Sequence, residues 1–174
     1  MNVRWLLPIG VVVTPIAQVA VAAQYMTVEQ AQRAAFPDAT TFAATEPSPE
    51  AQRAVAAPPG WTPKIWRARA GDLDLGWLIV DQVIGKSELI TYALALDPYG
   101  AVSSIEILDY RESHGGEIRL AGWRKQFAGK NATDPVELNK DIKNISGATL
   151  SCRHVTEGVQ RLLLLLHKSA LAGR

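Results

Sequence analysis

The chain contains very little cysteine and carries almost no net charge. Cys152 is the only cysteine among 174 residues, so no intrachain disulfide can form. The formal net charge is +1, and no run of Lys and Arg exceeds two neighbours. These values exclude the basic footprint of a protein that binds nucleic acid or an anionic membrane surface. A cysteine near a helix start can be a redox site, but we interpret Cys152 as a small packed residue.

Several catalytic motifs are also missing. His114, His154 and His167 lack the spacing of metal ligands, and the Gly-x-Ser-x-Gly elbow of serine hydrolases does not occur. The segment Gly85-Lys86-Ser87 is not a P-loop, because Val80 occupies the position of the upstream glycine and no helix is predicted to follow. We therefore expect no self-contained enzyme.

The longest apolar segment lies at the N-terminus. Residues 1–4 carry one positive charge, residues 5–13 are apolar, and Ala20–Ala23 is a run of small residues. This order is typical of a secretory signal peptide, which we assign to residues 1–23, with cleavage after Ala22 or Ala23. The alternative is an uncleaved membrane anchor over residues 5–23, although its two prolines disfavour a continuous helix. Both alternatives predict a periplasmic protein, either released or anchored to the inner membrane.

Residues 24–60 are predicted to form an N-terminal helix and a loop. Thr27 with Gln30 three residues later is a capping box, and the helix should end near Phe36, ahead of a proline. Thr40–Gly60 has no sustained periodicity, so we expect a loop with one helical turn near Pro49–Val55.

Residues 61–168 are predicted to form an α+β domain with an antiparallel sheet of about four strands. Short turns between the strands favour a meander, and Asp97-Pro98-Tyr99-Gly100 is a strong turn signal. The strand pattern begins at Lys64. The predicted strands cover Trp66–Ala70, Leu73–Ile84, Ile90–Leu96 and Val102–Tyr110. In the second strand Leu73, Leu75, Trp77 and Ile79 are expected on one face; in the third, Ile90, Tyr92, Leu94 and Leu96.

Helices are predicted to flank the sheet on the C-terminal side. Leu120–Phe127 should form a short amphipathic helix, and residues 129–140 a loop. Arg153–Leu166 has apolar residues at the spacing of one helix face, which predicts a C-terminal amphipathic helix. The segment Asn144–Ser151 before it contains small residues and hydroxyls, so Thr149 or Ser151 could cap that helix, whose N-terminus attracts anions.

Ser146-Gly147-Ala148-Thr149-Leu150-Ser151 resembles the flavinylation motif of the FMN-binding domain family. This family includes flavin-carrying components of the sodium-pumping NADH:quinone reductase and of the Rnf electron-transport complex. The resemblance implies that a periplasmic flavin transferase uses FAD to attach FMN to Thr149 through a phosphoester bond, releasing AMP. One position departs from the pattern: Lys143 stands where the family usually has Asp, and Asp141 lies two residues further back.

Within the polar loop Arg111–Glu117, the segment Glu112–Gly115 resembles the family's Glu-Thr-Pro-Gly stretch beside the flavin, with Ser113 for Thr and His114 for Pro. The resemblance therefore implies a set of cofactor-binding residues: Thr149, Ser146, Gly147, Ala148, Leu150, Ser151, Glu112, Ser113, Gly115 and Gly116. It also implies electron transfer with membrane redox partners at the outer face of the inner membrane. The alternative is a periplasmic module that binds flavin or a peptide without passing electrons.

Overall fold

The computed structural model describes residues 23–169, so the predicted signal peptide or anchor lies, except for Ala23, outside the described residues. The strands are β1 (Ala23–Gln24), β2 (Thr41–Thr45), β3 (Lys64–Ala70), β4 (Leu73–Ile84), β5 (Leu89–Leu96) and β6 (Val102–Tyr110). The helices are α1 (Val28–Ala35), α2 (Pro49–Ala54), α3 (Ala121–Arg124) and α4 (Thr149–Lys168), with two short 3₁₀ helices, η1 (Gly116–Arg119) and η2 (Lys125–Phe127).

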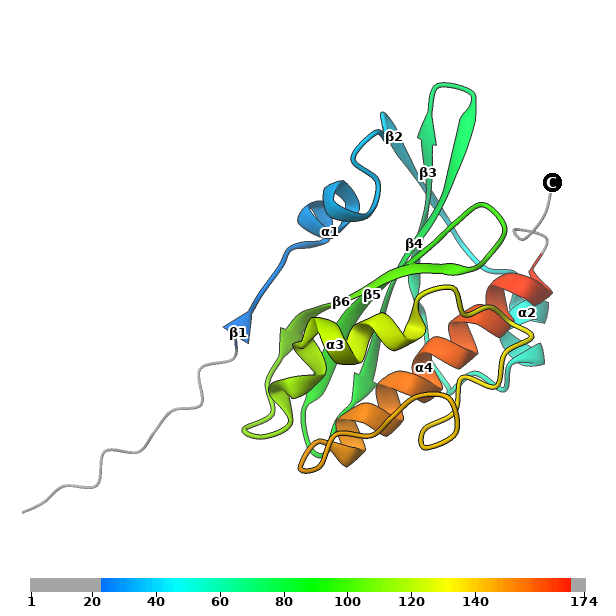
Figure 1. The fold of residues 1–174 in the computed structure, drawn as a ribbon. Helices are drawn as coiled ribbons and strands as arrows, with labels where there is room; N and C mark the ends of the chain where they lie inside the picture. Colours follow the sequence, from blue (N-terminus) through cyan, green and yellow to red (C-terminus); the bar gives the residue numbers. More distant parts are fainter. Residues whose placement is uncertain (1–22, 170–174) are drawn as a thin grey trace, which may run out of the picture.

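The strands form one antiparallel sheet in the order β1-β6-β5-β4-β3-β2 (Figure 1). The predicted meander is confirmed, since β3, β4, β5 and β6 follow one another in sequence and pair with their neighbours. The turn after β5 is also confirmed: Gly100 has a φ of 86°, and Asp97 accepts from the N–H groups of Tyr99 and Ala101. The α+β class therefore holds.

The sheet is wider than predicted because two edge strands were missed. The expected loop over Thr40–Gly60 contains β2, which pairs with β3 from Thr41↔Arg69 to Thr45↔Ile65. The side chains of β2 are exposed or only partly buried, so the segment lacks the apolar alternation by which a strand is recognised. At the other edge, the two residues of β1 pair with the end of β6.

Helices cover both faces of the sheet (Figure 1). The helices α2, α3 and α4 lie over one face, and their apolar residues form the larger core with residues of β4, β5 and β6. The shorter helix α1 lies over the opposite face and packs with a second apolar cluster that includes Leu78 and Ala93. The predicted inward face of β5 is confirmed, because Ile90, Tyr92, Leu94 and Leu96 are all fully buried.

A β-bulge changes the side-chain pattern predicted for β4. Ala68 pairs with Gly76 whereas Arg69 pairs with Asp74, so Leu75 is the extra residue. As a consequence Leu75 packs against the α1 cluster, while Trp77 lies in the α4 core. The expectation that Leu75 shares a face with Trp77 is wrong, and Leu73 is mainly exposed.

The helix predictions hold to different degrees. The capping box of α1 is confirmed, with Thr27 and Gln30 bonding each other's backbone N–H groups, and so is the turn of helix at α2. The helix predicted over Leu120–Phe127 is in part a 3₁₀ helix, since only Ala121–Arg124 is α-helical. Between residues 23 and 169, no helix has both the length and the apolar character needed to cross a bilayer.

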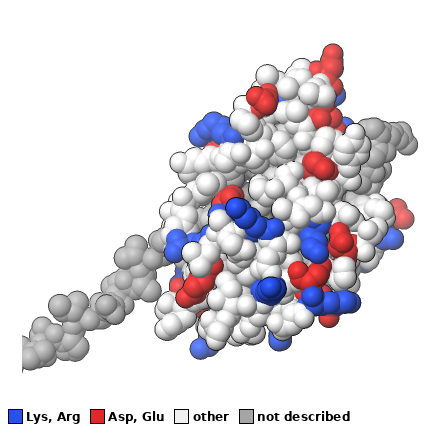
Figure 2. Space-filling view, viewed as in Figure 1, with Lys and Arg blue, Asp and Glu red and all other residues white. Residues whose placement is uncertain are grey.

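Charged side chains of both signs are interspersed on the face that carries α3 and α4 (Figure 2). Some of them pair across elements: Arg124 forms an ion pair with Glu106 of β6, and Lys130 Nζ lies 2.8 Å from Asp141 Oδ2. All four of these side chains are partly buried. The first pair joins α3 to β6, and the second joins the loop after η2 to the loop before α4.

Candidate functional site

A pocket of about 520 Å³ lies where the start of α4 meets the turn between β4 and β5 and the loop after β6. Such a volume is within the range of about 300–1,000 Å³ usual for small-molecule sites. Its lining residues are Lys86, Ser87, Glu112, Ser113, His114, Gly147, Ala148, Thr149, Leu150 and Ser151. The two segments that resemble the flavin motifs, far apart in sequence, therefore face one cavity.

The backbone before α4 turns sharply at Gly147. The N–H of Ala148 donates to the carbonyl of Ile145 over 3.0 Å, and Gly147 between them has a φ of 87°. No atom lies within 4 Å of the position that a Cβ on Gly147 would occupy. Glycine is therefore required here by the left-handed backbone and not by a close neighbour.

Thr149 is the first residue of α4, and its side chain is exposed. The Thr149 hydroxyl oxygen accepts a hydrogen bond of 2.9 Å from Asn144 Nδ2. The residue before the helix is Ala148, which offers no side-chain cap, and the first intrahelical bond described runs from Cys152 N to Ala148 O. The prediction that Thr149 or Ser151 caps the helix is therefore wrong.

The uncapped start of α4 suits an anion. The first N–H groups of an α-helix have no partner within the helix, and the helix dipole adds partial positive charge there. The residues that carry these groups, 149–151, line the pocket, and so does Lys86. A phosphate in this pocket would therefore meet backbone N–H donors and a cation.

Ser151 is turned inward and joins the helix to the loop after β6. It is buried, and its Oγ lies 3.0 Å from the Tyr110 hydroxyl, which itself donates to the carbonyl oxygen of His114. Because a phenol carries a single hydrogen, Ser151 must be the donor to Tyr110. Burial raises the pKa of Tyr110 above its usual range, so this hydrogen remains on the phenol.

Gly115 belongs to the same junction. Its φ is 88°, and a Cβ placed on it would lie 2.7 Å from the Tyr110 hydroxyl oxygen and 3.2 Å from Ser151 Oγ. Neither Gly115 nor Gly116 lines the pocket, and Ser146 does not line it either. The remaining residues implied by the resemblance do line it. Gly115 thus lets the loop approach Tyr110 and Ser151 closely.

Glu112 holds the opposite wall of the pocket in place. Its Oε1 accepts from the N–H groups of Ser87 at 2.6 Å and Glu88 at 2.9 Å. Burial raises the pKa of Glu112, but the backbone donors of the turn outweigh it and the net pKa is lowered. Glu112 is therefore an ionised clamp on the turn that presents Lys86.

Lys86, Ser87 and His114 line the pocket but were not predicted as site residues. The signal that could have located the first two is strand pairing. In the sheet Ile90 pairs with Tyr110, so the turn before β5 must lie beside the loop after β6. His114 is oriented by Ser113, whose Oγ lies 3.0 Å from His114 Nδ1.

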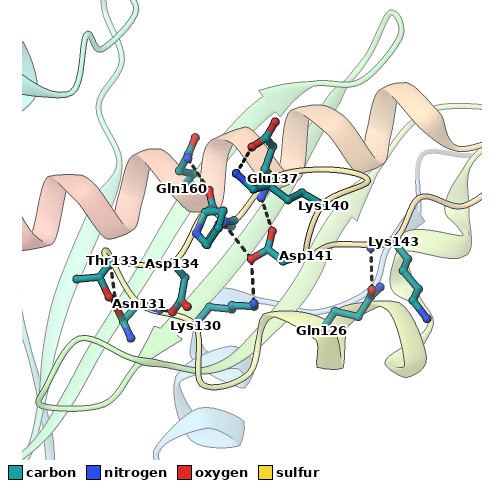
Figure 3. Close-up of polar contacts among 12 residues, drawn as sticks. Gln126, Lys130, Asn131, Thr133, Asp134, Glu137, Lys140, Asp141, Lys143 and Gln160 are labelled. Atoms are coloured by element: carbon teal, nitrogen blue, oxygen red, sulfur yellow. Dashed lines mark hydrogen bonds and ion pairs between the residues drawn. The ribbon is translucent and has the colours of Figure 1, made fainter.

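The loop that leads into the motif is fixed by Asp141 (Figure 3). Asp141 accepts from the N–H groups of Val136 and Glu137 and pairs with Lys130. Burial alone would raise the pKa of Asp141, yet these donors and Lys130 lower it. The Asp141 carboxylate is therefore occupied by partners within the loop.

The backbone of Lys143 is fixed by hydrogen bonds on both sides, and its side chain is exposed. Its N–H donates to Gln126 Oε1 over 2.8 Å and its carbonyl oxygen accepts from Trp123 Nε1 over 2.9 Å. In Figure 3 the Lys143 side chain extends away from Asp141 and is free of the dashed contacts drawn there. Lys143 does not line the pocket.

Cys152 is fully buried beneath the first turn of α4. Burial raises the pKa of its thiol, which opposes the lowering expected from the helix N-terminus. The interpretation as a packed residue is confirmed.

A larger pocket of about 680 Å³ contains none of the motif residues. One of its walls is the buried Asp81, which accepts from Trp61 Nε1 at 2.7 Å and from the Tyr92 hydroxyl at 2.8 Å. Burial raises the pKa of Asp81 despite these bonds. Across residues 23–169, no cluster of three or more His, Cys, Asp or Glu side chains could hold a metal ion.

The part of the chain that matches a known protein family contains the smaller pocket. Residues 85–164 match the family model of the FMN-binding domain, a range that includes every residue lining this pocket. A comparison with curated proteins gives no significant match. The family match supports a flavin-binding protein with FMN as its cofactor, and the uncapped helix start with Lys86 fits the phosphate of that cofactor.

Proposed function

We propose that this protein is an exported flavoprotein that carries FMN covalently on Thr149 and transfers electrons between redox partners at the outer face of the inner membrane. The observation that carries the proposal is the position of Thr149. Its exposed hydroxyl stands at the pocket, on the first residue of an uncapped 20-residue helix. A phosphate esterified to this oxygen would lie at the helix N-terminus, where anions are stabilised.

The proposed attachment requires a second protein, a periplasmic flavin transferase that uses FAD. The Thr149 hydroxyl oxygen forms a bond to the phosphorus of the FMN half, and the pyrophosphate bond of FAD breaks. AMP leaves with the bridging oxygen, and the hydroxyl hydrogen passes to a base. Because this chain supplies the acceptor hydroxyl alone, the reaction places no demand on it for a catalytic base.

The other two hydroxyls of the motif are poorer acceptors. Ser151 is buried, and its hydrogen is engaged by Tyr110. Ser146 is exposed but does not line the pocket. These differences favour Thr149 even though all three residues lie within one short segment.

The flavin ring supplies the redox chemistry, and the protein supplies its position and electrostatic surroundings. A covalent link suits an exported protein, because tethering keeps the effective concentration of the cofactor high outside the cell's flavin pool. The membrane redox proteins that donate and accept the electrons are the partners of this proposal. The predicted signal peptide or anchor in residues 1–23 supports the location.

The attachment is tested by coexpression with the transferase, denaturation, desalting and intact-mass measurement. Wild type should retain yellow colour and gain the mass of FMN less one water. Thr149→Val should fold and carry no flavin, Thr149→Ser should retain some, and Ser151→Ala should keep it. Flavin retained by Thr149→Val and lost from Ser151→Ala would assign attachment to Ser151.

Electron transfer is tested separately by reducing the flavinylated protein and mixing it with membranes of the producing bacterium. Reoxidation of the flavin absorbance by membranes without oxygen supports the proposal. A flavin that membranes neither reduce nor oxidise would favour the alternative, a module that binds flavin without passing electrons.

A further inference from the structure

Asn144 lies beside the proposed attachment oxygen, although the resemblance assigns it no role. Its Nδ2 donates to Thr149 Oγ1 over 2.9 Å. The other amide atom, Oδ1, is buried, and no donor among residues 23–169 reaches it. A buried side-chain polar atom without a partner is uncommon in native proteins. The amide therefore has bonding capacity that the described part of the chain does not use.

Exchanging the positions of Oδ1 and Nδ2 would still leave one buried amide atom without a partner. If Oδ1 faced Thr149 instead, it would accept the hydroxyl hydrogen, and Nδ2 would take the buried, unpaired position. The two orientations nevertheless differ in their effect on the hydroxyl. A hydroxyl has one hydrogen and two lone pairs. When Nδ2 donates to one lone pair, Asn144 leaves the hydrogen and the second lone pair of Thr149 free.

A nucleophilic hydroxyl needs a free hydrogen and a free lone pair. One lone pair must face the phosphorus atom, and the hydrogen must face the base that removes it. A donor on the remaining lone pair fixes the hydroxyl without competing for either. Once the ester has formed, Oγ1 has no hydrogen, so only the orientation with Nδ2 toward the oxygen remains favourable. The negative phosphodiester further favours a donor at this place.

The backbone on both sides of Asn144 is already fixed. Both the N–H and the carbonyl of Lys143 are hydrogen-bonded to residues near α3, Gln126 and Trp123. On the other side the carbonyl of Ile145 accepts from Ala148. The Asn144 side chain is thus presented to Thr149 by a held segment, which lowers the entropy cost of orienting the hydroxyl.

We propose that Asn144 is a positioning residue for flavin attachment, whose Nδ2 orients the Thr149 hydroxyl for transfer and then donates to the phosphoester group. This inference rests on the proposed attachment at Thr149. It assigns a role to a side chain two positions before Ser146, outside the Ser-Gly-Ala-Thr segment.

The test measures the rate of attachment to purified unflavinylated protein, with excess transferase and FAD, by in-gel flavin fluorescence over time. Loss of one ordinary hydrogen bond corresponds to about a two- to tenfold slower reaction in Asn144→Ala. Asn144→Asp should be slower still at neutral pH, because a carboxylate takes the hydroxyl hydrogen and repels the phosphate. Asn131→Ala is the matched control, since Asn131 is also an amide but lies outside both motif segments and does not line the pocket, and its rate should equal that of wild type.

The pH dependence of Asn144→Asp separates positioning from a general structural effect. A protonated Asp is again a donor, so its rate relative to wild type should rise as the pH falls toward the Asp pKa, roughly 4. The charged and titratable residues that line the pocket are Lys86, Glu112 and His114, and Lys143 precedes Asn144 in sequence; all four are common to both proteins. Dividing by the wild-type rate at each pH removes their contribution and that of the transferase.

The outcomes are distinct. If wild type is flavinylated and Asn144→Ala reacts at the same rate, the role of Asn144 is refuted and the proposed function stands. An Asn144→Asp protein that reacts faster than wild type also refutes it, because the group would then act as a base. If wild type never acquires flavin, the proposed function fails, and this inference fails with it.

Discussion

Substituting alanine for Gly115 should destabilise the protein for two separable reasons. The residue has a φ of 88°, which costs an L-amino acid about 1–2 kcal/mol. The new Cβ would also lie 2.7 Å from the Tyr110 hydroxyl oxygen, and overpacking of this kind costs about 1–3 kcal/mol. Gly115→Ala should therefore lower the free energy of unfolding by about 2–5 kcal/mol in total.

Gly147 provides the matched control. Its φ of 87° is nearly the same, but no atom lies within 4 Å of its added Cβ. Gly147→Ala should therefore show the conformational cost alone, about 1–2 kcal/mol. Urea unfolding gives both values, and thermal unfolding should separate the variants by about 2–4 °C per kcal/mol.

A third variant identifies the atom responsible. Tyr110→Phe removes the hydroxyl that the new Cβ would meet, so Gly115→Ala should cost less in the Tyr110→Phe background than in wild type. Equal losses for Gly115→Ala and Gly147→Ala, with no coupling to Tyr110, would refute the reasoning. In that case the loop would relax without contacting Tyr110.

Three other outcomes are expected at the site and the N-terminus. Glu112→Gln should be less stable than wild type mainly above about pH 4. The pKa of Glu112 is lowered in the folded state, so its carboxylate stabilises the fold above the unfolded pKa of roughly 4.3, and this stabilisation is lost as the pH falls through the folded pKa. A difference in melting temperature between the two proteins that grows toward acid pH would contradict this. Lys86→Gln should lower the reduction potential of bound FMN in a redox titration, because a cation at the pocket favours the added negative charge. Lys140 does not line the pocket, so Lys140→Gln should leave the potential unchanged. N-terminal sequencing of the exported protein should begin at Ala23 or Gln24, whereas an intact N-terminus on a membrane-bound product would support the anchor.

Much of the fold could be predicted because local signals agree with the tertiary structure. The capping box of α1, the turn at Asp97–Gly100 and the buried face of β5 each follow from the chemistry of a few neighbouring residues. The bulge at Leu75 could not, because it depends on how β3 pairs with β4. The strand β2 could not either, since its side chains bury little surface and it is held by the backbone pairing with β3.

Both segments that line the pocket, with Thr149 and Glu112, could be located from the sequence, whereas the turn with Lys86 and Ser87 could not. The motif residues are contiguous, so Thr149 could be singled out from sequence. The role of Lys86 and the clamp by Glu112 depend on strands that bring residues some 25 positions apart into contact. The start of α4 was misplaced because a backbone turn through Gly147 begins the helix, with no side-chain cap to mark it.

The site of flavin attachment can be read directly from a peptide. Trypsin cleaves after Lys and Arg, so the segment between Lys143 and Arg153 is released as Asn144–Arg153, which contains all three hydroxyls of the motif. For protein exported together with its flavin transferase, fragmentation of this peptide should place the mass of FMN, less one water, on Thr149. A peptide modified on Ser146 or Ser151, or recovered wholly without flavin, would contradict the account.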